Sequence, residues 1–239
     1  MKKVMLLAII VIYSIGSLFS QTTISGIGKL KLYSPISIIN DLGYNSKTKK
    51  LSTQGDYYRY IYEKSTGSNI YEIIADSITG TNGCFGYFNP KIRLFYLPNY
   101  EITSTLKITQ VKLLFYNDIL ISIECYGGSE LVGALDLKYG KSETKYEKED
   151  HTFTYTYTGA KIVKTDETFI STWNTNLKNV SCVRTLMSFF NDKGEELFSS
   201  ILKLCDKTYD SEIFEIEQSI KNRKEYKDLE IKKKSLEGI

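Results

Sequence analysis

Residues 104–126 read STLKITQVKLLFYNDILISIECY, in which two apolar and β-branched runs flank Asn117-Asp118. Ser104 to Tyr116 and Ile119 to Tyr126 each have the composition of a strand, and the short polar pair between them is typical of a hairpin turn. The pattern therefore predicts an antiparallel hairpin, with Lys91 to Leu97 as the strand before it.

The N-terminal side of this hairpin predicts one short helix among strands. Ile24 to Leu32 has a strand pattern, and Ile36 to Leu42 follows as a helix that Gly43 ends. Asp56 to Lys64 and Asn69 to Asp76 then predict a second hairpin. This part of the chain is therefore expected to be a helix followed by an antiparallel meander.

The C-terminal side repeats this order. Gly127-Gly128 ends the strand run, and Leu131 to Tyr139 predicts a second helix. Lys141 to Asp150 alternates in charge and predicts a solvated loop. Four strands are expected after it, of which the last two form a hairpin: His151 to Thr158, Lys161 to Trp173, Val180 to Phe190 and Glu195 to Leu204.

The last segment, Asp210 to Ile239, is rich in Glu and Lys and predicts a charged helix. Ile213, Ile216 and Ile220 share one face of it. We therefore expect its first two turns to dock on the sheet and the rest to be solvated or frayed, with a partner-binding or coiled-coil helix as the alternative.

Together these elements predict an α+β fold with a mainly antiparallel sheet and a C-terminal helix. The chain divides into a signal peptide at 1–20, a first α+β unit at 21–128, a second at 129–209 and the charged helix at 210–239. One interpretation is that the two units are tandem copies of one helix-plus-meander plan. The other is that helices and strands alternate in this order by coincidence. The pattern leaves open whether they form one domain or two.

Residues 1–20 have the features of a secretory signal. Lys2 and Lys3 precede an apolar run from Val4 to Ile15, and small residues lie before Gln21. The run has about 12 residues, fewer than the ~20 that a membrane-spanning helix needs. The expected cleavage point carries no cysteine for lipid attachment. We therefore expect an exported chain, periplasmic or extracellular, with no membrane span in its mature part.

The charge balance and the single histidine narrow the function classes. The 239 residues include 31 Lys and Arg against 28 Asp and Glu, so net charge does not favour nucleic acid or anionic membrane as a partner. His151 is the only histidine, which disfavours Ser-His-Asp triads, Cys-His pairs and multi-His metal sites. Phosphate-loop, Cys-x-x-Cys and Gly-x-Ser-x-Gly motifs are absent. The sequence indicates no catalytic residue, no metal and no cofactor.

Aromatic residues are the candidates for ligand binding. Tyr58, Tyr60 and Tyr62 share one face of a predicted strand, and Trp173 is the only tryptophan. Exposed, such side chains stack on sugar rings or anchor a protein interface. Buried, they are part of the core, which is the use that half-buried strands commonly make of aromatics.

Four cysteines in an exported chain permit disulfides. Cys182 and Cys205 flank the last predicted hairpin. A four-residue loop at its turn places them opposite each other, and a three-residue loop puts the two sulfurs on opposite faces. A Cys182–Cys205 disulfide is therefore one hypothesis. Free, buried cysteines that act as small apolar residues are the other.

Three stretches carry a resemblance: Gly28 to Leu32, Ser37 to Gly43 and Val111 to Leu120. Their order resembles that of the BamE-type outer-membrane assembly proteins, although this chain lacks their lipid-bearing cysteine. A second unit from Leu131 to Leu204 resembles the tandem arrangement of the β-lactamase-inhibitor proteins. Leu137 to Lys141 and Trp173 are also similar to features of uncharacterised secreted bacterial proteins. The resemblance implies a scaffold for protein binding and envelope assembly, and no functional residue is transferred by it.

The sequence thus favours an exported, non-catalytic protein that binds a protein or a cell-envelope component. The alternative is a secreted glycan-binding or glycan-processing protein, which the Tyr-rich strand favours. Paired carboxylates cleave sugars without histidine. A cleft lined by two carboxylates and exposed aromatics would support that alternative.

Overall fold

The computed structural model describes residues 23–44, 70–73, 87–154, 159–191 and 194–236. Its elements in chain order are β1 (Gly26–Ile27), β2 (Leu30–Lys31), α2 (Ile38–Asp41), β3 (Tyr71–Ile73), β4 (Ile92–Glu101), β5 (Lys107–Tyr116), β6 (Ile119–Tyr126), α4 (Ser129–Tyr139), β7 (Glu143–Thr154), β8 (Lys161–Trp173), β9 (Val180–Phe190), β10 (Glu196–Asp206) and α5 (Lys207–Leu236).

One antiparallel sheet organises the fold. Within the described residues its eight strands lie in the order β3-β4-β5-β6-β10-β9-β8-β7, and β1 and β2 form a separate small hairpin. The α+β class, the mainly antiparallel sheet and the C-terminal helix are therefore confirmed. Because β6 pairs with β10, the strands of the two expected units join into a continuous sheet.

The β5–β6 hairpin forms where the sequence predicts it. Asn117 and Asp118 both have positive φ, 49° and 62°. A two-residue hairpin turn whose twist matches that of the strands requires positive φ at both of its residues. Leu113, Phe115 and Leu120 have no exposed surface. Burying large apolar side chains of this kind stabilises the sheet by about 1.5–3 kcal/mol each.

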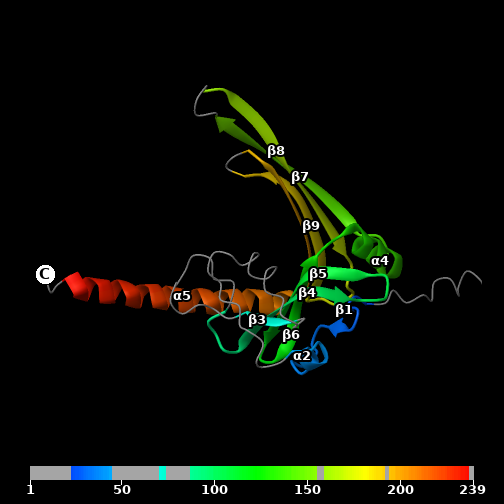
Figure 1. The fold of residues 1–239 in the computed structure, drawn as a ribbon, viewed down its shortest axis with the longest axis horizontal. Coiled ribbons are helices and arrows are strands. Elements are labelled where there is room, and N and C mark those ends of the chain that lie inside the picture. The colour runs from blue at the N-terminus through cyan, green and yellow to red at the C-terminus, as the bar shows by residue number, and fades with distance from the viewer. Residues whose placement is uncertain (1–22, 45–69, 74–86, 155–158, 192–193, 237–239) are drawn as a thin grey trace, which may run out of the picture.

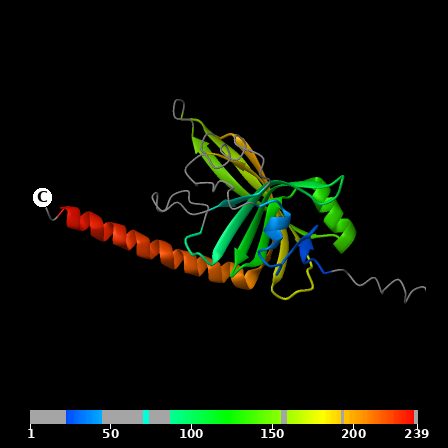
Figure 2. The same cartoon turned by 60° about the horizontal axis from the view of Figure 1, so that its bottom comes forward.

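The sheet has two faces, which we name after the helices that pack on them. The α4 face carries Phe115 and Leu202 and is covered by Leu131 and Leu135 of α4, together with the β1–β2 hairpin and α2. The α5 face carries Leu94, Leu114 and Tyr116, and Ile213 of α5 packs against it. Figures 1 and 2 show these elements on opposite sides of the sheet.

The expected strand Ile24–Leu32 is instead the β1–β2 hairpin. Gly28 turns the chain with a φ of 61°, a conformation that glycine adopts without steric cost. A Cβ on Gly26 would lie 2.1 Å from the carbonyl oxygen of Leu30, so the close approach of the two strands requires glycine there.

The first turns of α5 dock on the sheet, and the rest of the helix runs outward (Figures 1 and 2). Ile213 is 3% exposed, whereas Phe214, Leu229 and Ile231 are 57–69% exposed. Glu217 is 6% exposed and accepts the backbone N–H groups of Phe88 and Asn89 at 3.0 and 2.8 Å. The docking of the first turns agrees with the sequence-based expectation.

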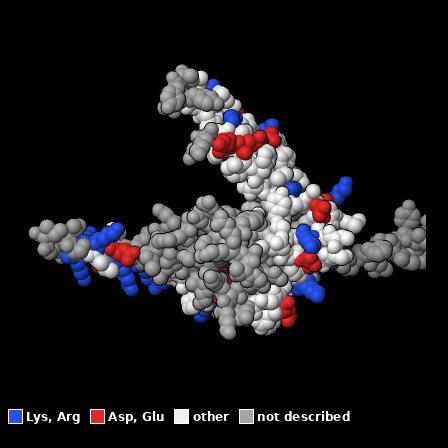
Figure 3. All heavy atoms as spheres, viewed as in Figure 1, with Lys and Arg blue, Asp and Glu red and all other residues white. Residues whose placement is uncertain are grey.

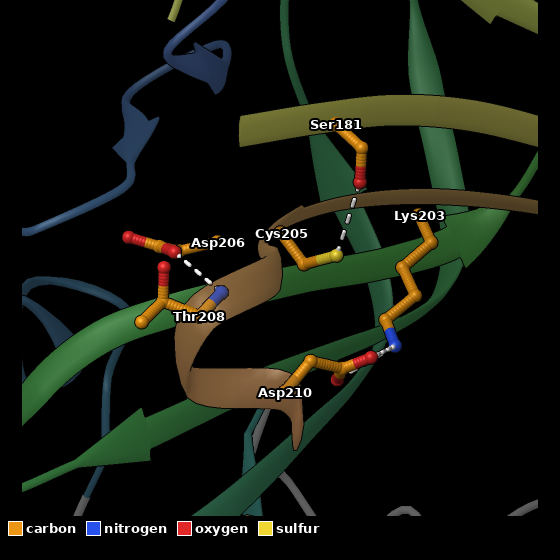
Figure 4. Close-up of polar contacts among 6 residues, drawn as sticks. All are labelled: Ser181, Lys203, Cys205, Asp206, Thr208 and Asp210. Atoms are coloured by element: carbon orange, nitrogen blue, oxygen red, sulfur yellow. Dashed lines mark hydrogen bonds and ion pairs between the residues drawn. The ribbon is translucent and has the colours of Figure 1, made fainter. Parts of the chain in front are cut away.

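Polar contacts join β10 to α5 at their junction (Figure 4). The buried Asp206 accepts the backbone N–H of Thr208 at 2.9 Å and the hydroxyl of Tyr33 at 2.7 Å. Both oxygens of Asp210 lie 2.9 Å from the Nζ of Lys203. A carboxylate at the start of a helix satisfies a free N–H group there, so these contacts fix where α5 begins.

The expectation of a solvated loop over Lys141–Asp150 is wrong, because Glu143 to Thr154 forms the edge strand β7. Its charges are compatible with pairing to β8, since they find partners across the strands. Lys148 lies 3.4 Å from Glu167, which also accepts the Tyr146 hydroxyl at 2.7 Å.

Candidate binding surface

The outer parts of β7, β8, β9 and β10 extend beyond the rest of the protein as a curved arm (Figures 1 and 2). We define the arm as residues 143–154, 161–170, 184–190 and 196–201. Ser200 is its only buried residue, and the others are half-buried or exposed. Among the described residues the arm is therefore a single layer of sheet, whereas domains are normally built from two or more packed layers.

The α5 face of the arm carries an apolar group. Strand alternation places Ile170, Met187, Phe189, Leu197 and Ile201 on this face. Phe189 lies directly opposite Leu197, which is 40% exposed, and Ile201 is 38% exposed.

The α4 face of the arm carries a second apolar group. Tyr146 and Phe169 are opposite each other on β7 and β8, with stacked rings 4.6 Å apart, and Leu186 continues the row on β9. Val163 and Phe198 lie on the same face and are 61% and 72% exposed. Apolar side chains thus lie on both faces.

Charged side chains of both signs lie close together on the arm, with uncharged surface between the arm's tip and its base on the side seen in Figure 3. One such pair joins the Nζ of Lys148 on β7 to Glu167 on β8 at 3.4 Å. The arm therefore has no single-sign field that would select a highly charged partner.

The two edges of the arm differ in chemistry. On β7, the edge segment Glu143–Asp150 contains six charged residues among eight. Charged side chains protect an edge strand from pairing with another chain. On β10, the four residues Leu197–Ser200 are uncharged, so this edge lacks that protection.

The outer half of β10 has an open edge because β6 is shorter. Residues Glu196 to Asp206 all pair with β9, but only Ile201 to Cys205 pair with β6. The N–H of Gly127 donates to the carbonyl of Ser200 at 3.0 Å, so Ser200 directs its carbonyl away from β9. By strand alternation, the backbone groups of Glu196 and Phe198 also point to this open side.

A polar cluster fixes the end of β6 at the point where the edge of β10 becomes free, which we call the fork. The carbonyl of Gly127 accepts the Nε of Arg184 at 2.8 Å and the hydroxyl of Ser200 at 2.7 Å. A Cβ on Gly127 would lie 3.1 Å from the Arg184 side chain and 3.3 Å from the Leu202 backbone nitrogen, so glycine suits this tight position. The free edge of β10 therefore begins at a defined point.

A cavity of ≈ 270 Å³ lies at the fork, next to the free edge. Gln110, Glu124, Tyr126, Phe198 and Ile201 are among the residues that line it. The side chains of Tyr126 and Ile201 are 48% and 38% exposed, so the cavity is accessible from solvent.

A second cavity, of ≈ 160 Å³, lies between the sheet and α5 and contains paired charges. Lys112 lies 2.6 Å from Glu124, and Lys203 binds Asp210. Burial, together with nearby acidic groups, raises the pKa of Tyr87 to about 12. Each ammonium has its own carboxylate and the phenol stays protonated at neutral pH, which favours a structural role for this cluster.

Trp173, for which the sequence left a core role and a ligand platform open, is a core residue. It is 2% exposed, and its indole N–H donates to Asp136 of α4 at 2.8 Å. It lies directly opposite Cys182 on β9 within the α4-face core. A buried ring has no free face for a ligand, so its burial supports the core interpretation of Trp173.

The other aromatic candidates, Tyr58, Tyr60 and Tyr62, lie outside the described residues. Their predicted role stays a prediction. The same holds for the predicted strand Asp56–Lys64 and the signal peptide at 1–20.

The Cys182–Cys205 disulfide does not form in this structure. The loop has three residues between Asn191 and Glu195, so Cys182 lies opposite Leu204 and Cys205 opposite Ser181. The two thiols are free and lie on opposite faces of the sheet. The Sγ of Cys205 is 3.4 Å from the hydroxyl of Ser181 (Figure 4). The alternative of free, buried cysteines describes both residues.

We therefore expect Cys125, Cys182 and Cys205 to react with iodoacetamide only after unfolding. Each is at most 5% exposed, and reaction requires an accessible thiolate. Peptide mapping of the denatured, unreduced chain should recover Cys182 and Cys205 in separate alkylated peptides. A linked Cys182–Cys205 peptide pair that reductant splits would contradict the β9–β10 register.

Sequence reasoning missed the free edge of β10 and Phe198. The available signal is a difference in strand length, since β9 and β10 each have 11 residues and β6 has eight. That difference indicates an open edge only once β6 and β10 are known to be neighbours, which is a long-range pairing.

The described residues contain neither a metal-binding cluster nor a membrane-spanning helix. No three His, Cys, Asp or Glu side chains in the described ranges are grouped so that they could hold a metal ion. Of the helices in those ranges, none has both the length and the apolar character needed to cross a lipid bilayer.

Comparison of the chain with protein-family models, with curated proteins and with solved structures gave no match. The resemblance to BamE-type and β-lactamase-inhibitor modules therefore stays a prediction.

Proposed function

We propose that the chain is an exported, non-catalytic protein that binds another protein through the arm. The observation that carries this proposal is the single layer of the arm, in which only Ser200 is buried. A sheet with apolar side chains on both faces gains about 25 cal/mol for each Å² of apolar surface that a partner covers. Contiguous exposed apolar surface commonly marks an interaction site.

The side chains of the arm favour a protein over a glycan as the partner. The apolar group on the α5 face contains the aliphatic side chains Ile170, Leu197 and Ile201 together with Met187. Methionine is enriched at protein interfaces, and aliphatic side chains pack against other side chains. Sugar rings are bound by exposed aromatic platforms, and on the arm the exposed aromatics Tyr146 and Phe198 are accompanied by this larger aliphatic group.

Export is supported by the basic start, apolar run and small residues of positions 1–20. The buried thiols are compatible with an oxidising compartment. Cys125, Cys182 and Cys205 are at most 5% exposed, and Cys182 and Cys205 lie on opposite faces of the sheet, so the fold prevents a disulfide between these two.

The proposal predicts that replacing exposed apolar residues of the arm abolishes capture of the partner. The test variant combines Ile162→Ser, Val163→Ser and Leu197→Ser, whose side chains are 40–61% exposed. Its affinity for the partner is expected to fall by tenfold or more, since loss of about 1.4 kcal/mol already gives a factor of ten. Affinity capture from an extract of the source cells, followed by titration of the captured protein, measures this.

The matched control makes the same kind of change on α5. Phe214→Ser, Tyr226→Ser and Leu229→Ser remove three apolar side chains that are 57–69% exposed. This control should bind like the unmodified chain. If the control loses the partner and the arm variant keeps it, the binding surface is α5 and the proposal is wrong.

A further inference from the structure

We propose that the free edge of β10, Glu196–Ser200, binds an extended segment of a partner protein as an added β-strand in line with β6. This inference rests on the proposed function and specifies how the arm binds. Strand addition to an open sheet edge obtains affinity from main-chain hydrogen bonds and specificity from pockets for alternate side chains.

The first argument is the backbone of β10. Its register with β9 is continuous from Glu196 to Asp206, without a bulge. The N–H and C=O groups of Glu196 and Phe198 therefore point away from β9, to a side where the described residues supply no strand. Glu196, Leu197 and Phe198 are exposed, so a second chain can reach these groups.

The second argument is that the same edge already pairs with a strand farther along. Ile201 to Cys205 pair antiparallel with β6, and Gly127 bonds to Ser200 as the last rung. An added antiparallel strand would continue this pairing beyond the fork. Because Arg184 and Ser200 hold the Gly127 carbonyl, the site is ordered before the strand arrives, which lowers the entropic cost of binding.

The third argument concerns the side chains of the incoming segment. A residue opposite Phe198 would lie on the α4 face, beside the exposed ring of Phe198. A residue opposite Ser199 would lie on the α5 face, next to the ≈ 270 Å³ cavity that Ser199 and Ile201 help to line. The site therefore suits an uncharged segment with two successive apolar side chains.

A second copy of this chain fits the edge poorly. In a symmetric pairing of two β10 strands centred on Phe198, Glu196 of one copy would lie opposite Ser200 of the other. Ser200 is not free to pair with Glu196 of a second copy, because its carbonyl already accepts the N–H of Gly127 at 3.0 Å. A segment without its own β6 beside it meets no such obstacle.

The experiment begins with amide hydrogen exchange by NMR on the purified full chain. The amides of Glu196 and Phe198 should exchange rapidly, and those of Leu197 and Ser199, which point to β9, slowly. The probe is a synthetic peptide with the sequence of β6, residues 119–126, carrying Cys125→Ser and two terminal lysines for solubility. It should slow exchange at Glu196 and Phe198 by at least about tenfold, and the same peptide N-methylated at alternate residues should not.

Two variants separate the backbone from the side chain at the edge. Phe198→Pro removes one outward N–H and leaves the β9–β10 bonds intact, so peptide affinity should fall by about tenfold or more. Phe198→Thr removes the same ring, keeps the N–H and should bind more tightly than Phe198→Pro by about tenfold. Glu196→Pro is the second blocking variant, at the start of the strand, where proline is well tolerated.

Four outcomes would overturn the inference. Slow exchange at Phe198 in the chain alone means that another segment of the same chain, such as Asp56–Lys64, occupies the edge. Protection that rises with protein concentration means that a second copy occupies it. A peptide that protects neither amide means that the edge does not accept a strand. If an arm-dependent partner binds Phe198→Pro and Phe198→Thr equally well, the proposed function stands and strand addition fails.

Discussion

Replacing Trp173 by alanine should lower the free energy of unfolding by about 3–5 kcal/mol, the usual cost of removing a large buried aromatic side chain. Trp173 is 2% exposed and lies opposite Cys182 in the α4-face core. The variant would leave a cavity and also remove the indole N–H that donates to Asp136 of α4 at 2.8 Å. Chemical denaturation followed by far-UV circular dichroism measures the change.

The conservative variant Trp173→Phe separates packing from hydrogen bonding. It keeps most of the apolar volume but leaves Asp136 with the backbone N–H of Ser142, at 3.2 Å, as its remaining bond among those described. Its cost should be about 1.5–3 kcal/mol, the range for a hydrogen bond to a charged group. If Trp173 were a ligand platform, both variants would keep their stability and lose ligand binding instead.

The central hairpin was predictable because its signals are local. The observed bounds of β6 are those expected from the sequence, since Asn117-Asp118 sets the turn and Gly127-Gly128 ends the strand. The observed bounds of β8 and β9 also match the expected ones. Alternation and turn residues act within a few positions of each other, so one sequence is enough to locate them.

The β7 strand was missed because its charged residues indicate exposure to solvent and carry no signal for pairing with another strand. Lys141 to Asp150 is highly charged, and a segment with alternating charge is typical of a solvated loop. Here the arm is open on both faces, so charges on either side of β7 remain in water. The absence of a second layer could not be inferred from residue order alone.

The disulfide hypothesis is wrong because the loop between β9 and β10 is one residue shorter than that pairing requires. Gly194 has a φ of 72° and its N–H donates to the carbonyl of Asn191 at 2.7 Å, which closes a three-residue loop. A loop one residue longer would have placed Cys182 opposite Cys205. Since side chains alternate along a strand, a slip of one position moves every side chain to the other face.

The candidate site depends on contacts that are distant in sequence. Gly127 and Ser200 are 73 positions apart, yet they form the fork at which the free edge begins. Phe198 has the same local pattern as a core residue, yet it is 72% exposed and lies beyond the point where β6 ends. Such a site is visible only when the strand order is known.

Raising the pH above 9 should destabilise the protein because two thiols are buried in the α4-face core. Cys125 and Cys182 are 2% and 1% exposed. Burial raises the pKa of each thiol to about 12 from an ordinary value of 9.0, and a nearby cysteine thiol adds to each shift. The folded chain therefore holds these protons at a pH where the unfolded chain has lost them.

The sign of the effect follows from linkage. A group whose pKa is higher in the folded state contributes its full stability below the unfolded pKa, here 9.0, and loses it as the pH rises toward 12. One pH unit in this window costs about 1.4 kcal/mol per thiol, so at pH 11 the two thiols together would cost on the order of 5 kcal/mol. Tyr33, whose pKa burial and the bond to Asp206 raise to about 12, acts in the same direction above pH 10.

Urea denaturation at several pH values between 8 and 11 measures the decline. The double variant Cys125→Ala and Cys182→Ala should be less stable at pH 8 but lose stability more slowly above pH 9. Val111→Ala is the matched control, because Val111 is fully buried in the same core and carries no titrating group. It should lower stability equally at every pH and keep the steep alkaline decline. Equal slopes for the double cysteine variant and the unmodified chain would mean that the two thiols are accessible to solvent, against their burial beneath α4.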